Sequence, residues 1–146
     1  MTEPDTYTVS AIRRRKQRKP PPRIDGPQDL YRLLKPLLEN QDREHFYAVL
    51  LSTKNHVLAV ELVSVGSLSA SIVHPREVFK PAILQSAAAV VVAHNHPSGV
   101  VDPSPEDTEF TKRLQRAGEL LGITLLDHLI IANGGDLLSL KERGLF

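Results

Sequence analysis

The feature that most constrains the fold is the short apolar run AAVVVA at residues 88–93. A β-branched run without alternating polar residues suits a strand that is covered on both faces. Helical patterns precede it over 75–87 and follow it over 104–121. The sequence therefore predicts an α/β domain in which a mixed sheet is packed between helices.

Apolar periodicity and turn residues predict the other elements. Residues 27–40 place five leucines on one helical face, but Pro36 lies inside this pattern and should kink the helix or split it into two pieces. The expected strands are a hairpin over 45–52 and 56–65 around the turn TKN, a third strand over 68–73, a strand over 123–132 and a final strand over 136–140.

The composition excludes several classes of protein. The chain has 146 residues, the size of one ordinary domain, and its 41% apolar residues suffice for a core. It contains no cysteine, so disulfides, thiolate zinc sites and cysteine nucleophiles are excluded, and any metal must be held by histidine and carboxylate groups. The sequence offers neither a membrane-spanning apolar stretch nor the apolar segment of a secretory signal. We therefore expect a cytoplasmic protein.

Charge is distributed unevenly along the chain. Residues 1–23 hold seven Lys/Arg and two acidic residues, whereas the remainder holds eleven basic and fifteen acidic residues. Like charges repel, and three consecutive prolines at 20–22 favour an extended form. We interpret residues 1–23 as a flexible basic arm and residues 24–146 as the single folded domain. Such an arm could neutralise the phosphates of DNA, which makes DNA a possible partner.

His94 and His96 follow the central apolar run directly. Residues two apart in a strand point to the same side, so both imidazoles can face one point. Two imidazoles and a carboxylate form a common catalytic zinc set, which leaves a fourth position for water. Asp107, in the first turn of the predicted helix, is the candidate carboxylate. The segment SPED at 104–107 is equally a helix start, with Ser104 as N-cap and acids beside the positive end of the helix dipole.

Residues 94–107 also form a longer pattern: His-x-His, seven residues, Ser, two residues, Asp. This pattern matches the JAMM motif of JAB/MPN metallopeptidases at every specified position, and the loop HNHPSG resembles the RadC-like branch of that family. The segments AVLLSTKN, VSVGSL, VHPREVF and LLDHLII extend the resemblance over about residues 27–146. The contiguous letters HNH are no evidence for an HNH nuclease, whose three residues are dispersed over a ββα-metal motif.

The resemblance implies the JAB/MPN fold, a cytidine-deaminase-like mixed sheet, and a zinc-dependent hydrolase of peptide or isopeptide bonds. It implies one bound zinc ion, held by His94, His96 and Asp107. By the same resemblance Glu44, before the first strand, is the general base, with Glu61 as the competing carboxylate. The Ser104 hydroxyl would donate to the oxyanion, a role that we expect to need a different hydroxyl direction from the cap.

Other functions remain open at this point. A DNA-associated repair or accessory protein would use the basic arm, and RadC-like proteins have long carried a DNA-repair label. A metal-free MPN scaffold is a further alternative, although such relatives lose a metal ligand and this chain retains the set. The substrate stays open between an ordinary peptide, a ubiquitin-like modifier and another amide, and exposed sheet edges would allow a homodimer.

The remaining polar residues near the motif have structural interpretations. Asp127 and His128 lie in one predicted strand on opposite faces, so no direct dyad is expected and only one of them can support a metal-bound imidazole from behind. We interpret Asn95, Ser98 and Asp102 as residues that shape the loop.

Overall fold

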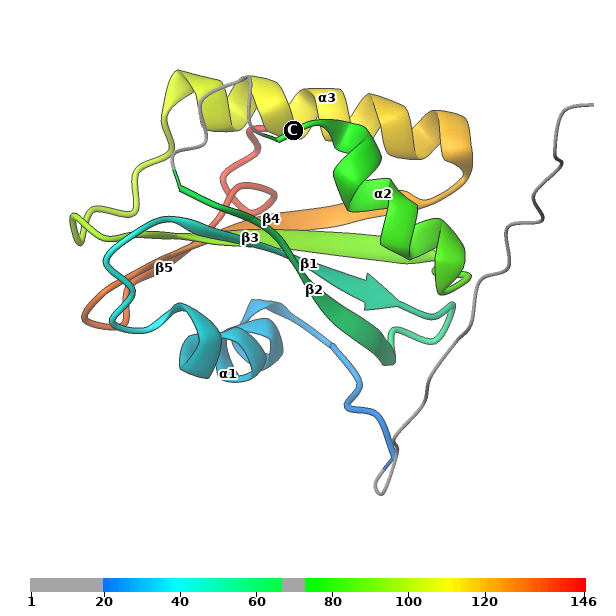
Figure 1. The fold of residues 1–146 in the computed structure, drawn as a ribbon, viewed down its shortest axis with the longest axis horizontal. Coiled ribbons are helices and arrows are strands. Elements are labelled where there is room, and N and C mark those ends of the chain that lie inside the picture. Colours follow the sequence, from blue (N-terminus) through cyan, green and yellow to red (C-terminus); the bar gives the residue numbers. More distant parts are fainter. Residues whose placement is uncertain (1–19, 67–72) are drawn as a thin grey trace, which may run out of the picture.

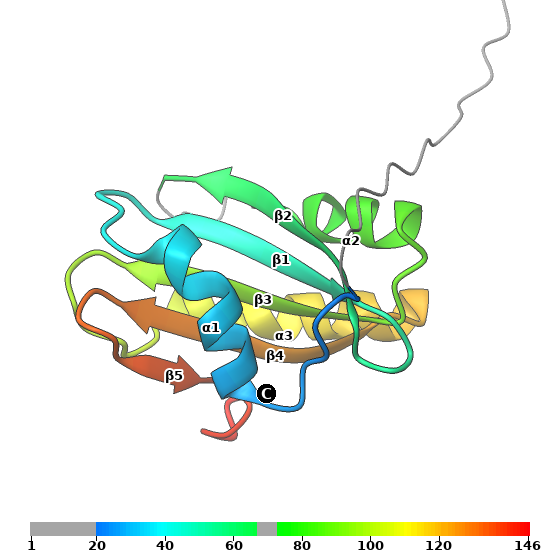
Figure 2. The ribbon, with the colours of Figure 1, turned by 90° about the horizontal axis from the view of Figure 1, so that it is seen from below.

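A five-stranded sheet separates α1 from α2 and α3 (Figure 1). The computed structural model describes residues 20–66 and 73–146. Figure 2, turned by 90°, shows α1 crossing one face of the sheet, with α3 behind the other face. The predicted α/β domain with a mixed sheet between helices is therefore confirmed. The elements in chain order are α1 (Pro27–Leu38), β1 (His45–Leu51), β2 (Val57–Val65), α2 (Pro75–Leu84), β3 (Ala89–His96), α3 (Pro105–Leu121), β4 (Thr124–Ala132) and β5 (Leu137–Ser139).

The strand order is β2-β1-β3-β4-β5, with β3 in the centre. β3 is parallel to β4 and antiparallel to β1, and the other neighbours are antiparallel. A parallel pair requires a crossover connection, and α3 supplies it. The apolar run 88–93 thus forms the central strand, as predicted. β3 continues through His96, and seven of its eight residues are buried.

Strand alternation divides the core into two layers. Val91 and Ala93 of β3 face α1, whereas Val90 and Val92 face α2 and α3. Each fully buried aliphatic side chain contributes roughly 1.5–3 kcal/mol to stability, so both layers are needed to hold the sheet. The helices contribute Leu30, Leu34 and Leu38 to the first layer, and Val78, Phe79, Ala82 and Leu114 to the second.

Two helices differ from their predicted form. α1 is one continuous helix that contains Pro36, so the expected split into two pieces is wrong. Pro36 lies close to the helix end, and the next turn is kept by the bond from Glu39 N to Lys35 O at 2.9 Å. α2 ends at Leu84 instead of residue 87, because Ser86 takes a left-handed φ of 54°.

The β1–β2 hairpin forms as predicted, and the final strand is shorter than expected. The expected strand over 68–73 falls almost wholly outside the described residues, as do residues 1–19 of the predicted arm. Pro22 accepts a hydrogen bond from Val57 N at 2.9 Å, which ties the start of the described chain to β2. In the described ranges, no helix combines the length and the apolar character that crossing a membrane requires.

Candidate metal centre

The end of β3 brings His94 and His96 to the face of the sheet that α3 covers. His94 pairs in register with Phe46 of β1, and its ring stacks on the Phe46 ring with 6.0 Å between centroids and 15° between planes. His94 is fully buried, whereas the His96 side chain is 14% exposed. Residues two apart on one strand therefore turn both imidazoles to one point, as the His-x-His pattern predicts.

Asp107 reaches the same point from the first turn of α3. Ser104 Oγ accepts from Asp107 N at 3.1 Å, and the Asp107 carboxylate accepts from Ser104 N at 2.9 Å. This reciprocal capping box confirms the helix-start interpretation of Ser104. The Asp107 carboxylate also lies 3.5 Å from His94 Nε2 and 3.4 Å from His96 Nε2. The cap therefore fixes the carboxylate in place between the two rings.

The three side chains fit a small cation. His94 Nε2 and His96 Nε2 lie 2.9 Å apart, and the candidate ligand atoms all lie within 4.8 Å of one another. Ligand atoms around tetrahedral zinc are about 3.4 Å apart when the metal bonds are near 2.1 Å, close to the nitrogen-to-oxygen distances here. His96 Nδ1 lies 2.7 Å from Val100 O, which can only accept, so this nitrogen carries the hydrogen and Nε2 is left to bind.

The charges of the group suit a bound cation. Burial alone would raise the pKa of Asp107, but the imidazoles of His94 and His96 beside its carboxylate hold that pKa far below the ordinary value. The hydrogen bond to Asp107 in turn raises the pKa of His96. Asp107 is thus a carboxylate at any ordinary pH, almost wholly buried between two imidazoles. A buried charge of this kind needs a partner cation or proton.

Behind the group lies His128 of β4, which pairs in register with Val92 and so faces the same side as His94. His128 Nε2 lies 2.8 Å from His94 Nδ1. Asp127 faces the other way, where its carboxylate accepts from Ser139 Oγ at 2.6 Å. From the alternation of side chains along the strand, either Asp127 or His128 could have supported a metal-bound imidazole. The register of β4 against β3 places His128, and not Asp127, beside His94. No pattern in the sequence indicated Thr111, which contacts His128 from α3.

Glu44 lies immediately before β1, and its backbone carbonyl accepts from Gly66 N at 2.8 Å. It is half-buried, and its negative charge adds to the raised pKa of His96, after the larger effect of Asp107. Glu61 pairs with Ala48 on the outer strand β2, so it lies two strands from the histidines. The structure therefore brings Glu44, and not Glu61, towards the group.

Asn95 has a larger structural role than the predicted shaping of a loop. It lies within β3, fully buried, with its side chain on the face opposite the histidines. Its Oδ1 accepts from His45 N at 2.6 Å, and its Nδ2 donates to Arg43 O at 2.9 Å. These bonds flank Glu44, so Asn95 fixes the backbone from which Glu44 projects. Asp102, by contrast, is exposed in the loop.

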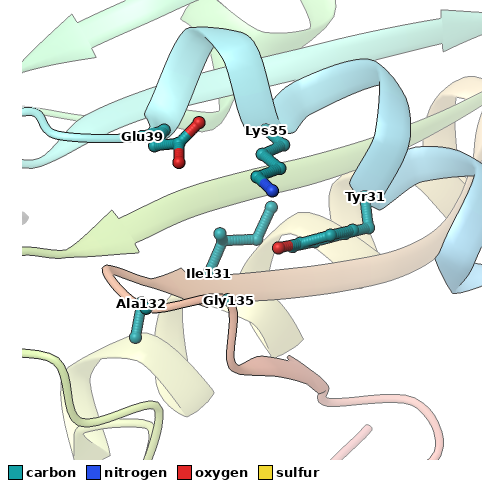
Figure 3. Close-up of a pocket in the computed structure, with 7 residues that line it drawn as sticks. Tyr31, Lys35, Glu39, Ile131, Ala132 and Gly135 are labelled. Carbon is teal, nitrogen blue, oxygen red and sulfur yellow. The ribbon is translucent and has the colours of Figure 1, made fainter.

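A hollow of about 180 Å³ lies on the α1 side of the sheet (Figure 3). Tyr31 and Lys35 line it from α1, and the Lys35 ammonium lies 5.8 Å from the Tyr31 ring centre. Its floor includes Ala132, which pairs in register with His96. The hollow is thus at the same end of the sheet as the histidines, but it contains none of the predicted site residues.

Comparison with known proteins agrees with the fold. Residues 24–145 match the model of the RadC-like JAB domain. The UPF0758 proteins of Rubrobacter xylanophilus, Shouchella clausii and Methanosarcina mazei are 56%, 53% and 50% identical over 124, 125 and 126 residues. These alignments cover 85–86% of this chain but only 54–55% of each relative, so the chain spans about half their length. The chain belongs to the RadC-like JAB domain family.

Proposed function

We propose that this domain is a zinc-dependent hydrolase of peptide or isopeptide bonds. The proposal is carried by the convergence of two imidazole nitrogens and one buried carboxylate, with 2.9–3.5 Å between the atoms of each pair. Membership of the RadC-like JAB family supports it, because residues 94–107 match the JAMM pattern at every specified position.

The ion would be held by His94, His96 and Asp107. Zinc takes neutral imidazole nitrogen and carboxylate oxygen as ligands, and a chain without cysteine offers no thiolate alternative. Bound there, it would supply Lewis-acid chemistry, lowering the pKa of a water in the fourth position and polarising the substrate carbonyl. The Phe46 ring stacks on the His94 ring and so covers this predicted ligand on the β1 side.

Glu44 would be the general base. Its carboxylate takes one proton from the attacking water as the water oxygen bonds to the carbonyl carbon, and delivers it to the amine nitrogen as the C–N bond breaks. One structural observation supports this role: Asn95 holds the backbone on both sides of Glu44, through hydrogen bonds with His45 N and Arg43 O.

Ser104 would donate its hydroxyl hydrogen to the carbonyl oxygen as that oxygen gains charge. In the capping box the Ser104 hydroxyl accepts from Asp107 N, and this uses a lone pair of the oxygen and not its hydrogen. The two roles therefore need no change of partner, contrary to the expectation from the sequence.

Metal content tests the ligand set. Elemental analysis of the purified chain should give about one zinc per chain, and His96→Ala should lose it, because two ligands hold zinc poorly. His56→Ala is the matched control, since His56 lies in the hairpin at the opposite end of β1. Equal zinc in wild type and His96→Ala would exclude the proposed site.

Hydrolysis of a panel of peptides and isopeptide-linked lysine substrates tests the reaction. Glu44→Gln should lower turnover at least about 100-fold while zinc content stays at the wild-type level, because general-base catalysis commonly supplies that factor. Glu61→Gln is the control and should keep its activity. A Glu44→Gln variant as active as wild type would exclude the mechanism.

A further inference from the structure

A closed set of hydrogen bonds lies behind the predicted ligands. His94 Nδ1 is 2.8 Å from His128 Nε2, and His128 Nδ1 is 2.6 Å from Thr111 Oγ1. Thr111 Oγ1 donates to the backbone carbonyl of Asp107 at 2.6 Å. The side chains of Thr111, His94 and His128 are fully buried. This Thr111–His128 relay joins a ligand of β3 to a ligand of α3 through β4.

The direction of each bond in the relay follows from the Asp107 carbonyl. A carbonyl oxygen only accepts, so it uses the single hydroxyl hydrogen of Thr111. Thr111 Oγ1 must then accept from His128, which places a hydrogen on His128 Nδ1. The His128 ring is fully buried, and its two nitrogens face the Thr111 hydroxyl and the His94 ring, neither of which is an anion that would compensate a charge. The ring is therefore neutral, and its Nε2 can only accept. His94 therefore donates from Nδ1.

The consequence for His94 concerns its other nitrogen. A neutral imidazole has one N–H, so a hydrogen on His94 Nδ1 leaves a lone pair on Nε2. Nε2 is the atom that lies 2.9 Å from His96 Nε2 and 3.5 Å from the Asp107 carboxylate. If the relay ran in the opposite direction, His128 would donate from Nε2, and the hydrogen of His94 would stand on Nε2 and block a metal. That arrangement is excluded, because the Thr111 hydroxyl donates its single hydrogen to the Asp107 carbonyl and has none for His128 Nδ1.

We propose that Thr111 and His128 are positioning residues that set the tautomer of His94 and hold its ring against the first turn of α3. The ligand set is then formed before a metal arrives. The inference rests on the proposed function only in taking His94 as a metal ligand. A purely structural role would not require this polarity, because packed apolar side chains can replace buried polar groups with little loss of stability.

Substitutions of Thr111 separate positioning from packing. Thr111→Val keeps the shape but removes the hydroxyl, so His128 is no longer restricted to the Nδ1–H form. Thr111→Ser keeps the hydroxyl. Thr108→Val is the matched control, because Thr108 makes the same kind of bond four residues back, to Ser104 O at 3.4 Å, on the same helix.

Zinc affinity is measured by competition with a chromogenic chelator at one fixed pH. Thr111→Val should raise the zinc dissociation constant about 10–100-fold, as loss of a group that orients a ligand typically does. Thr111→Ser should stay within about threefold of wild type on the same scale. Thr108→Val should bind like wild type. Wild-type affinity in a folded Thr111→Val protein would overturn the proposal.

Nitrogen-15 NMR of the histidine rings in the metal-free wild-type protein tests the tautomers without any substitution. Both His94 and His128 should show Nδ1 protonated and Nε2 bare. A hydrogen on His94 Nε2 would overturn the inference even if the protein binds zinc and hydrolyses peptides. If the wild type binds no zinc, the proposed function fails, and the ring spectra still decide the relay. The ring spectra of the wild type also decide the direction of the relay if the Thr111→Val protein does not fold.

Discussion

Asn95 accepts a hydrogen bond from the backbone N–H of His45 at 2.6 Å, and through this bond the strand with both histidines holds the start of β1. A second bond, from Asn95 Nδ2 to Arg43 O at 2.9 Å, holds the chain on the other side of Glu44. One buried amide between the two predicted ligands thus fixes the backbone of the predicted base. The relation requires β1 and β3 to be neighbours, which the antiparallel register of Phe46 and His94 provides.

The first prediction concerns Asn95 itself. Asn95→Ala should lower the free energy of unfolding by about 1–3 kcal/mol, because it leaves two part-buried hydrogen bonds, to His45 N and Arg43 O, without the Asn95 side chain. Turnover should fall further than zinc content, since Glu44 loses its fixed backbone while the metal ligands stay. Asn133→Ala, in the exposed turn after β4, is the control. Loss of zinc and turnover in equal proportion would show that Asn95 acts on the ligands instead.

The second prediction concerns the capping box. Ser104→Ala should lower the stability of the metal-free protein by about 1 kcal/mol, because Asp107 N loses its acceptor, whereas Ser104→Thr should keep most of it. Chemical denaturation measures both. If the proposed function holds, Ser104→Ala in the zinc-loaded protein should also lower turnover by about 10²–10³-fold, far more than the lost cap explains. A turnover loss of only a few fold would remove Ser104 from the oxyanion role.

The third prediction is a pH dependence of the metal-free protein. The hydrogen bond to Asp107 raises the pKa of His96, with a smaller contribution from the Glu44 charge. A histidine whose pKa is higher in the folded protein than in the unfolded chain stabilises the fold, and this effect is complete below the unfolded pKa, near 6.5. The stabilisation is lost as the pH rises through the pKa of the folded protein. The stability difference between wild type and His96→Gln should therefore be widest below pH 6.5 and shrink at higher pH.

This comparison of two proteins cancels the opposite effect of His128. Burial lowers the pKa of His128 in the folded protein. Its contribution to the free energy of unfolding is therefore present above pH 6.5 and is lost as the pH falls. Both variants contain His128, and denaturation across pH 5–9 in the presence of a chelator measures the difference. A difference that grows with rising pH would contradict the ion pair between His96 and Asp107.

The fourth prediction concerns the turn that connects α3 to β4. Gly118 is buried in α3, and a Cβ at this position would overlap the backbone carbonyl of Ile123. Gly118→Ala should therefore destabilise the fold by about 1–3 kcal/mol, the usual effect of overpacking, despite the better helix propensity of alanine. Thermal unfolding measures it. Gly26→Ala is the control, because no atom lies within 4 Å of its added Cβ. An unchanged stability of Gly118→Ala would show that the Ile123 carbonyl can move away from α3 without cost.

The fifth prediction tests the DNA-binding alternative. Deletion of residues 1–19 removes six Lys/Arg but keeps Pro22, which bonds to β2. If the arm binds phosphates, DNA affinity should fall, and the dependence of the binding constant on salt should become shallower. A full-length chain with these six residues changed to Gln is the matched control and should behave like the deletion. DNA binding that survives both changes in full would exclude the arm as its cause.

Much of the fold was predictable because its signals are local. The apolar run at 88–93 required cover on both faces, and the SPED segment at 104–107 predicted the cap that begins α3. Pro36 misled the prediction for α1, because a proline near a helix end removes little of the hydrogen bonding that holds the helix. The early end of α2 depends on the left-handed backbone of Ser86, which no residue preference indicates.

The sequence by itself determined the elements and the direction of side chains within each one: His94 and His96 on one face of a strand, and Asp107 in the first turn of a helix. Only the tertiary structure decided which distant groups meet them. The parallel register of β3 and β4 selected His128 over Asp127, and the packing of α3 brought Thr111 to it. Alternation gives each strand residue one of two faces, but the choice between those faces is made by neighbours far away in the chain.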